Sequence, residues 1–326
     1  MRSIPDISIV IPTYNRCSIL VEALECLARQ DTGGDFSYEI VVLDDLSDDK
    51  TPQVVRAFAA NSPVAVRYIL GEGMGYTHAL NSGVAEARGH YIAFFDDDQR
   101  THAGWLGALY RVARDEGADL VGGPIALRLP MENYKKMGPV YRDMCGETHN
   151  FIFPDRYIHK NPLPPGGNRL VKREVFERVG IFDENMLTGG CDRDFLLRAL
   201  GAGFRPGWAV GGDIEHLINV ERITPEHMKW YSLQWGCSFA YIDWKRWGMV
   251  KTISAALARV GQALLIHLPK ILWYLARGND MALRDRQALL WRAVGFVRKT
   301  LAMALPGVFP QKHFFSRVEF RRGRNV

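Results

Sequence analysis

The sequence has few cysteines, and their spacing suits neither a zinc site nor a disulfide framework. The five cysteines among 326 residues are an odd number, lie far apart and include no Cys-x-x-Cys pair; they are Cys17, Cys26, Cys145, Cys191 and Cys237. We therefore expect reduced thiols and a cytosolic compartment. The segment Met1–Asp6 leads straight into an apolar run, and we expect no signal peptide there.

Three other signals are missing. No repeat of solenoid period is visible. The glycine-rich segment Gly71–Gly75 matches neither the P-loop nor the dinucleotide-binding fingerprint, so it is weak evidence for phosphate binding. The apolar stretch Thr252–Ala276 is interrupted by Arg259, Pro269 and Lys270, which argues against a transmembrane span and favours an amphipathic segment.

Charge is unevenly distributed along the chain. The net charge is +5, but residues 226–326 hold 17 lysines and arginines against five acidic residues, a net charge of +12, which leaves residues 1–225 at −7. The basic, aromatic tail is therefore expected to face an anionic membrane surface or nucleic acid. Because no nucleic-acid-binding motif is present, we expect the membrane surface. A soluble helical hairpin packed on the rest of the protein is the alternative.

Apolar strands alternate with helical patterns in the first hundred residues. The expected strands begin at Ile7, Tyr38, Val64 and Tyr91, and the expected helices cover residues 18–30, 51–60 and 77–87. Such alternation indicates βαβ units and a mostly parallel sheet.

The apolar run Tyr91–Phe95 ends in three consecutive carboxylates, Asp96, Asp97 and Asp98. In an open α/β sheet the carboxyl ends of the strands form the ligand-binding edge. Adjacent carboxylates repel one another unless a cation or hydrogen-bond donors compensate, and a divalent ion that also binds phosphate is the natural partner. The alternative is an acidic surface turn or a cap for a helix over Thr101–Arg114.

Four blocks in series resemble family 2 glycosyltransferases of the GT-A fold. They are Ile11–Asn15, the strand that ends in Asp44-Asp45 with Ser47 after it, the helix with Ala79-Leu80-Asn81 and Gly83, and the acidic triplet. The resemblance implies a Rossmann-like α/β domain over residues 1–225, with a nucleotide-binding half (1–122) and an acceptor-binding half (123–225). A C-terminal amphipathic helical extension would follow over residues 226–326.

The resemblance also implies roles for the strand-end residues. Pro12 and Tyr14 would line the base pocket, and Asp44 and Asp45 would reach the base or ribose. Asp96 and Asp97 would face the ribose and sugar, while Asp98 would ligate Mn²⁺ or Mg²⁺. For Asp44 and Asp45, a turn-forming pair is the alternative.

The segment Gly189–Phe195 resembles the family's Glu-Asp-x-Asp block, which assigns the catalytic base to Asp192. Cys191 stands where the family has Glu, and this puts the role of that Glu in doubt. The resemblance further places His216 at the metal and Arg222 at the departing diphosphate. The alternatives are a helix N-cap for Asp192 and an ordinary solvated or core histidine for His216.

The Pro- and Gly-rich residues 123–168 are too long for an idle connection. We interpret them as the acceptor-side wall, with Gly166 and Gly167 allowing close approach of the backbone to a sugar. A surface excursion over an edge strand is the alternative.

The expected function is metal-dependent, inverting hexosyl transfer from a nucleotide sugar, with UDP as the expected carrier. The basic, aromatic tail suits a polyprenyl-diphosphate-linked glycan acceptor at the cytoplasmic membrane face. The whole chain most resembles bacterial exopolysaccharide enzymes, succinoglycan-type glucosyltransferases in particular. Two alternatives stay open: a sugar nucleotidyltransferase and a non-catalytic glycan-binding subunit. The tail helices could instead pair two chains.

Overall fold

The structure is a computed structural model that describes residues 4–148, 163–186 and 189–309. The described chain forms two compact units. The sheet unit lies within Met1–Arg128, Gly146–Leu187 and Cys191–Leu217. The helical unit lies within Leu129–Cys145, Thr188–Gly190 and Ile218–Val326.

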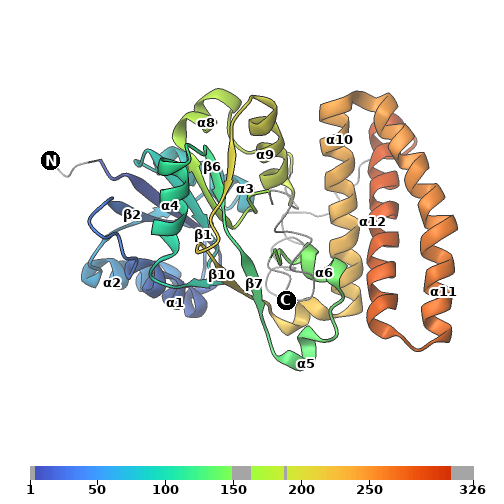
Figure 1. The fold of residues 1–326 in the computed structure, drawn as a ribbon, viewed down its shortest axis with the longest axis horizontal. Helices are drawn as coiled ribbons and strands as arrows, with labels where there is room; N and C mark the ends of the chain where they lie inside the picture. The colour runs from blue at the N-terminus through green and yellow to red at the C-terminus, as the bar shows by residue number, and fades with distance from the viewer. Residues whose placement is uncertain (1–3, 149–162, 187–188, 310–326) are drawn as a thin grey trace. The chain divides into compact units, whose positions relative to one another are not determined.

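A central sheet of seven strands, counted over the described residues, organises the sheet unit (Figure 1). Its order is β3 (Ala65–Leu70), β2 (Tyr38–Asp44), β1 (Ile7–Thr13), β4 (Tyr91–Phe95), β8 (Asn168–Lys172), β6 (Leu120–Gly122) and β9 (Pro206–Trp208). Only β8 runs antiparallel to its neighbours, β4 and β6, whereas the other pairs are parallel. The predicted mostly parallel sheet is confirmed.

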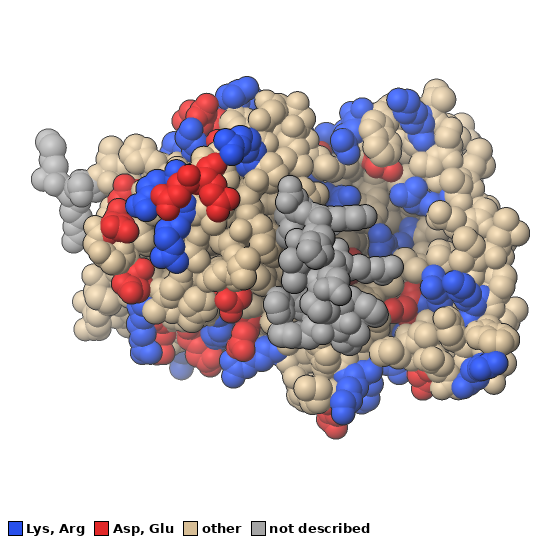
Figure 2. All heavy atoms as spheres, viewed as in Figure 1, with Lys and Arg blue, Asp and Glu red and all other residues tan. Residues whose placement is uncertain are grey.

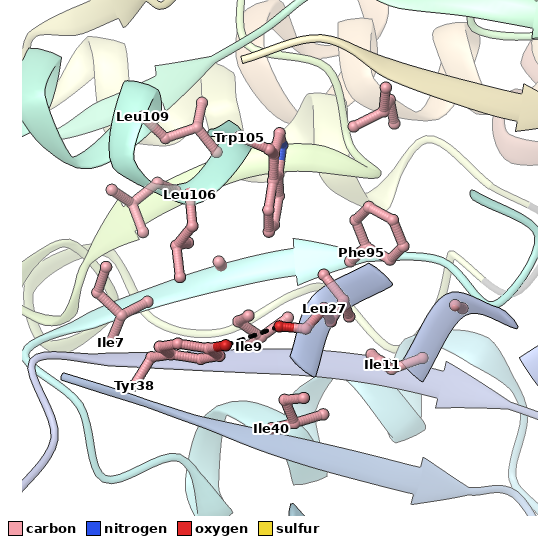
Figure 3. Packing of buried hydrophobic residues seen from close by; sticks show 14 of the residues in the cluster. Ile7, Ile9, Ile11, Leu27, Tyr38, Ile40, Phe95, Trp105, Leu106 and Leu109 are labelled. Carbon is pink, nitrogen blue, oxygen red and sulfur yellow. Dashed lines mark hydrogen bonds between the residues drawn. The ribbon is translucent and has the colours of Figure 1, made fainter. Parts of the chain in front are cut away.

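One face of this sheet is covered by α1 (Cys17–Ala28), α2 (Thr51–Asn61) and α4 (Trp105–Asp115). Figure 3 shows the resulting core, in which Trp105 packs edge-on against Phe95 with ring centroids 5.1 Å apart. The hydroxyl of Tyr38 donates to the carbonyl of Leu27 at 2.8 Å, which satisfies this buried polar group.

The opposite face is covered by α3 (Tyr76–Glu86), α8 (Arg173–Val179) and α9 (Cys191–Gly201). A Cβ on Gly83 would lie 2.3 Å from a methyl carbon of Val10, so α3 sits on the sheet at a distance that only glycine permits. Farther along, Phe94 of β4 meets Phe176 of α8, which stacks on Phe195 of α9. Both faces of β1, β2 and β4 are therefore buried, as their continuous apolar sequences predict.

A small second sheet follows the acidic triplet. Among the described residues it contains β5 (Gln99–Thr101), β10 (Ile214–Leu217) and β7 (Ile125–Arg128), in that order. The chain thus enters a short strand directly after Asp98, and α4 begins only at Trp105. The helix considered from Thr101 is wrong in its start, because residues 99–101 pair with β10.

The helical unit is built around α10 (Pro225–Gln262) and α12 (Asp280–Ala304). Gly236 and Gly295 let the two backbones approach closely, since a Cβ on either would lie 2.1 Å from a carbonyl oxygen of the other helix. Smaller elements complete the unit: α5 (Met131–Tyr134), α6 (Pro139–Met144), η1 (Val220–Ile223), the π-helical turn η2 (Ala263–His267) and α11 (Leu268–Ala276). Inside α10, Gly248 has φ of 75°, which divides it into two helices at a kink.

The second half of α10, η2 and α11 carry many exposed apolar side chains. Leu265 is 80% exposed and Leu272 is 68% exposed, and α11 has no buried residue. By length and composition alone, the helical stretch Pro225–Ala276 is also apolar enough to cross a membrane, with 11% of its most apolar window buried. Arg259, Pro269 and Lys270 therefore argue less strongly against a transmembrane span than we expected from the sequence.

Candidate active site

The three carboxylates of the acidic triplet lie directly after β4 and have different partners. Asp96 accepts hydrogen bonds from the hydroxyl of Tyr76 at 3.1 Å and from the side-chain amide of Gln99 at 3.3 Å. Asp97 and Asp98 instead share an arginine, Arg16. The triplet is therefore not a solvated surface turn.

Arg16, immediately after the Ile11–Asn15 block, holds Asp97 and Asp98 together. Its Nη1 lies 2.8 Å from a carboxylate oxygen of each. Burial would lower the pKa of Arg16, but the two carboxylates more than offset this and raise it. Burial raises the pKa of Asp97, with Arg16 opposing and Asp98 adding to the rise. The hydroxyl of Thr13 also donates to Asp97, at 2.9 Å. Hydrogen-bond donors thus compensate part of the triplet's charge.

His216 is brought to Asp98 by backbone pairing between β10 and β5. His216 pairs with Gln99 in this sheet, and the backbone N–H of Leu217 donates to the carbonyl of Asp98 at 2.8 Å. As a result, Nε2 of His216 lies 3.5 Å from Oδ1 of Asp98. The two predicted metal ligands are therefore neighbours in the fold, although their role as ligands stays a prediction.

Asp98 and His216 suit a divalent cation that takes two ligands from the protein and its other ligands from elsewhere. Among the residues that the structure describes, no group of three or more His, Cys, Asp or Glu side chains is arranged to hold a metal. Mg²⁺ in phosphate-binding sites commonly takes one or two protein ligands and fills its other positions with phosphate oxygens and water. An aspartate beside an imidazole nitrogen is a donor set that Mn²⁺ also accepts.

Asp192 lies in the first turn of α9, against the turn formed by Gly166 and Gly167. A Cβ on Gly166 would lie 2.6 Å from Oδ2 of Asp192, and a Cβ on Gly167 would lie 2.4 Å from Oδ2 of Asp96. Consecutive glycines thus contact both carboxylates, and a side chain at either would displace one. This turn brings the predicted base and the start of the acidic triplet to one place.

The residues beside Asp192 have other tasks. Cys191 is 1% exposed, and burial raises the pKa of its thiol to about 12, with Asp192 adding to the effect. The thiol is therefore neutral near pH 7 and does not replace the charge of the family's Glu. The buried carboxylate of Asp194 pairs with Arg198 at 2.8 Å, and Arg198 also donates to the carbonyl of Ile181. Asp194 thus anchors the start of α9.

Pro12 and Tyr14 lie at the carboxyl end of β1, as predicted. Pro12 pairs with Leu43 of β2, and Tyr14 is half-buried just beyond the strand. The following Asn15 adopts φ of 51°, and its N–H donates to the hydroxyl of Ser47 at 2.8 Å. The loops after β1 and β2 are therefore fixed to each other.

Asp44 and Asp45 fix the neighbouring loops of the same edge. Asp44 is fully buried and accepts hydrogen bonds from the hydroxyl of Tyr68 at 2.6 Å and from the N–H of Ser47 at 2.9 Å. Asp45 accepts from the N–H of Gly75 at 2.9 Å, which ties the glycine-rich loop to β2. These contacts are those of a turn-forming pair, and contact with a nucleoside stays a prediction for both residues.

Two further predictions concern other parts of the chain. Arg222 belongs to the helical unit, in η1, where its carbonyl accepts a hydrogen bond from the hydroxyl of Tyr141; its contact with a diphosphate stays a prediction. Of the expected acceptor-side wall over 123–168, residues 149–162 lie outside the described residues, and the described remainder includes β7, α5, α6 and the Gly166–Gly167 turn.

Four residues of the site were not predicted from the sequence: Arg16, Tyr76, Gln99 and Arg169. Arg16 follows a recognised block at once, so a search for a counter-ion to the triplet could have found it. No sequence pattern indicates that Tyr76 and Gln99 bind Asp96, and only the structure shows these contacts. Arg169 is fully buried within β8, and an arginine in a short strand gives no sign of such burial.

A family model decides how this site is classified. The model described as Glycosyl transferase family 2 matches residues 8–180, which is more than half of the chain. This chain belongs to glycosyltransferase family 2. The matched region contains the acidic triplet, Arg16 and the Gly166–Gly167 turn, and the family resemblance of the sequence is confirmed.

The relatives that match cover only part of this chain. Glycosyltransferase AglE of Haloferax volcanii is 28% identical over 202 residues, which span 62% of this chain and 64% of AglE. The GalNAc(5)-diNAcBac-PP-undecaprenol beta-1,3-glucosyltransferase of Campylobacter jejuni is 31% identical over 120 residues, 36% of this chain and 38% of that enzyme. The chain therefore spans less than two thirds of either relative.

The fold of this family 2 member is shared by a solved structure, the mannosyltransferase PcManGT from Pyrobaculum calidifontis. The two chains superpose with a TM-score of 0.60 at 19% identity, over 91% of this chain and 88% of the other. The mannosyltransferase was solved in complex with GDP-Man and Mn²⁺. At this identity the likeness concerns the fold, and the predicted GT-A fold is confirmed.

Proposed function

We propose that this protein is an inverting glycosyltransferase that moves a hexose from a nucleoside-diphosphate sugar, with a UDP-sugar as first candidate, to a hydroxyl of a lipid-linked bacterial glycan. The observation that supports it most is the Gly166–Gly167 turn, which contacts Asp192 on one residue and Asp96 on the next. A base that lies beside a donor-binding edge suits a single displacement at a sugar carbon.

The proposed reaction exchanges one bond at the anomeric carbon for another. Asp192 accepts the proton of the acceptor hydroxyl, and the oxygen attacks the anomeric carbon from the face opposite the diphosphate. As the new glycosidic bond forms, the bond to the diphosphate oxygen breaks and its electron pair leaves with the nucleoside diphosphate. An α-linked donor thus yields a β-linked product.

Charge on the departing diphosphate must be balanced. Asp98 and His216 would hold Mn²⁺ or Mg²⁺, which supplies positive charge to the diphosphate when bound. Arg16 keeps Asp97 and Asp98 in place beside that site. PcManGT, solved with GDP-Man and Mn²⁺, supports a nucleotide sugar and a divalent cation as ligands.

A screen of nucleotide sugars tests the proposal. Purified protein is incubated with each donor and Mn²⁺ or Mg²⁺, with and without an undecaprenyl-diphosphate-linked glycan, and nucleotide release and product linkage are measured. We expect release from one donor, stimulation by the lipid-linked acceptor and an inverted linkage. If no donor is bound or turned over under any condition, the transferase function is wrong and a glycan-binding protein becomes the better account.

A membrane-facing surface would bring the protein to such an acceptor, since the Campylobacter jejuni relative is named for an undecaprenol-linked substrate. We assign this role to the apolar helix face, defined by exposed residues on the helical stretch after Gly248: Val250, Leu257, Leu264, Leu265, Leu272 and Trp273. Lys251, Lys270 and Arg277 lie exposed on or next to the same segments, and Figure 2 shows basic side chains over the helical unit. Apolar area flanked by cations suits an anionic bilayer.

Introducing charge on this face is expected to release the protein from lipid. We expect wild type to sediment with vesicles of phosphatidylcholine and phosphatidylglycerol, and to bind less well in high salt or to phosphatidylcholine alone. Leu265→Glu with Leu272→Glu should weaken this binding by about 10²-fold or more, because two leucine side chains that are exposed in the free protein and would be buried in the lipid contribute roughly 1.5–3 kcal/mol each.

Val210→Glu is the matched control, since Val210 is 79% exposed and lies in the sheet unit. It should bind vesicles like wild type. If the double variant binds vesicles as well as wild type does, the face does not bind lipid. If light scattering also shows that wild type is a dimer and the double variant is not, the face pairs two chains instead.

A further inference from the structure

Arg169 is a charged residue in the interior of the sheet unit. It lies in β8, where it pairs with Phe94 of β4 and Gly122 of β6, and its side chain is 1% exposed. A guanidinium that is removed from water in this way destabilises the fold unless its hydrogen-bond donors are satisfied. The hydrogen bonds of Arg169 therefore indicate its role.

The guanidinium joins two segments that flank Asp192. Nη1 of Arg169 donates to the backbone carbonyl of Asp192 at 3.3 Å, and Nη2 donates to the carbonyl of Pro164 at 2.7 Å. Pro164 leads into the Gly166–Gly167 turn, whose first glycine contacts the Asp192 carboxylate. One side chain thus fixes both the first turn of α9 and the glycine turn opposite it.

These two bonds do not satisfy the whole group. Among the described residues, nothing accepts a hydrogen bond from Nε of Arg169. Burial lowers the pKa of Arg169, with Asp192, Cys191 and Tyr76 opposing that shift. A buried charge with an unsatisfied donor is costly, and an apolar side chain of similar volume is often neutral or stabilising in such a place. The charge of Arg169 therefore adds little to stability, and what the side chain supplies is its two bonds to backbone carbonyls.

We propose that Arg169 is a positioning residue for Asp192: it clamps α9 to the Pro164–Gly167 segment, so that the carboxylate is held against Gly166 in the geometry needed to accept the proton of the acceptor. This inference rests on the proposed function of Asp192 as the base. Arg169 itself does not contact substrate in this account. Its removal should affect turnover far more than donor binding.

Arg169→Met tests the inference, because methionine fills similar volume without charge. We expect kcat to fall by about 10²-fold, the cost of a small misplacement of a catalytic group. We expect the KM for the nucleotide sugar to stay within about twofold, and Tm to fall no further than in an Arg173→Met variant, which likewise loses two hydrogen bonds to backbone carbonyls. Arg169→Lys, which keeps the charge but cannot donate to both carbonyls in a fixed fork, should restore only part of kcat.

A double-mutant cycle separates positioning from general damage. If Arg169 acts through Asp192, Arg169→Met should cost almost nothing further in an Asp192→Asn background. Arg173→Met is the matched control, since Arg173 likewise donates to two backbone carbonyls, those of Gly89 and Ala87, but lies away from Asp192. Arg173→Met should lower Tm and leave kcat of the folded protein close to wild type.

The outcomes distinguish two kinds of failure. If Asp192→Asn retains activity, the proposed base is wrong and the positioning inference falls with it. If Asp192→Asn has the expected low residual kcat but Arg169→Met keeps its kcat, or lowers kcat by the same factor in the Asp192→Asn background as in wild type, Asp192 remains the base and Arg169 does not position it.

Discussion

Asp192→Asn lowers kcat by about 10²–10⁴-fold and leaves the affinity for the nucleotide sugar largely unchanged. This is the expected result because asparagine keeps the shape of aspartate, and with it the contact with Gly166, but cannot take a proton from the acceptor. Steady-state transfer rates together with calorimetric titration of the donor measure both quantities.

The control for this variant is Asp213→Asn. Asp213 is an exposed carboxylate of the sheet unit that pairs with His102 at 3.3 Å, so its loss should change neither rate nor binding. An Asp192→Asn protein with more than a tenth of the wild-type kcat would exclude Asp192 as the base. Loss of donor binding in that variant would point instead to a role on the donor side.

Asp98→Asn is expected to abolish the metal dependence of donor binding and to lower kcat/KM by about 10²–10³-fold. The amide is a weaker ligand for a hard cation, and the diphosphate loses the positive charge that stabilises it in the transition state. Wild type treated with EDTA should show a similar loss, which Mn²⁺ restores. Asp98→Asn should respond to neither treatment.

Glu215→Gln is the matched control, because Glu215 precedes His216 on β10 but is exposed and pairs with Arg128 at 3.1 Å. Its metal response should equal that of wild type. If EDTA does not change wild-type activity, the reaction is not metal-dependent. Arg16 and other basic side chains would then have to stabilise the negative charge of the diphosphate.

Local signals were strong enough to place the first half of the fold. The apolar runs of β1, β2 and β4 have buried residues at nearly every position, and their helices begin and end within a few residues of the predicted bounds. The antiparallel β8 and the small sheet of β5, β10 and β7 were not predicted. Their strands are three to five residues long, and their pairing depends on contacts between distant segments.

The same distinction applies to the site. Asp98, Asp192 and His216 lie in recognisable blocks, and the structure brings Asp98 to His216 and Asp192 to the Gly166–Gly167 turn. Arg16 and Arg169 were missed for different reasons. The first is a counter-ion whose partners lie far along the chain, whereas the second is buried in a strand where arginine is rarely found.

The order of the central sheet has a consequence for synthesis on the ribosome. β4 is paired with β1 on one side, but its other edge is covered only by β8, which lies about 70 residues later in the chain. Until Asn168–Lys172 emerges, the nascent chain presents the open edge of an apolar strand, a template for pairing with another chain. Translation products that stop before β8 should therefore aggregate or require a chaperone.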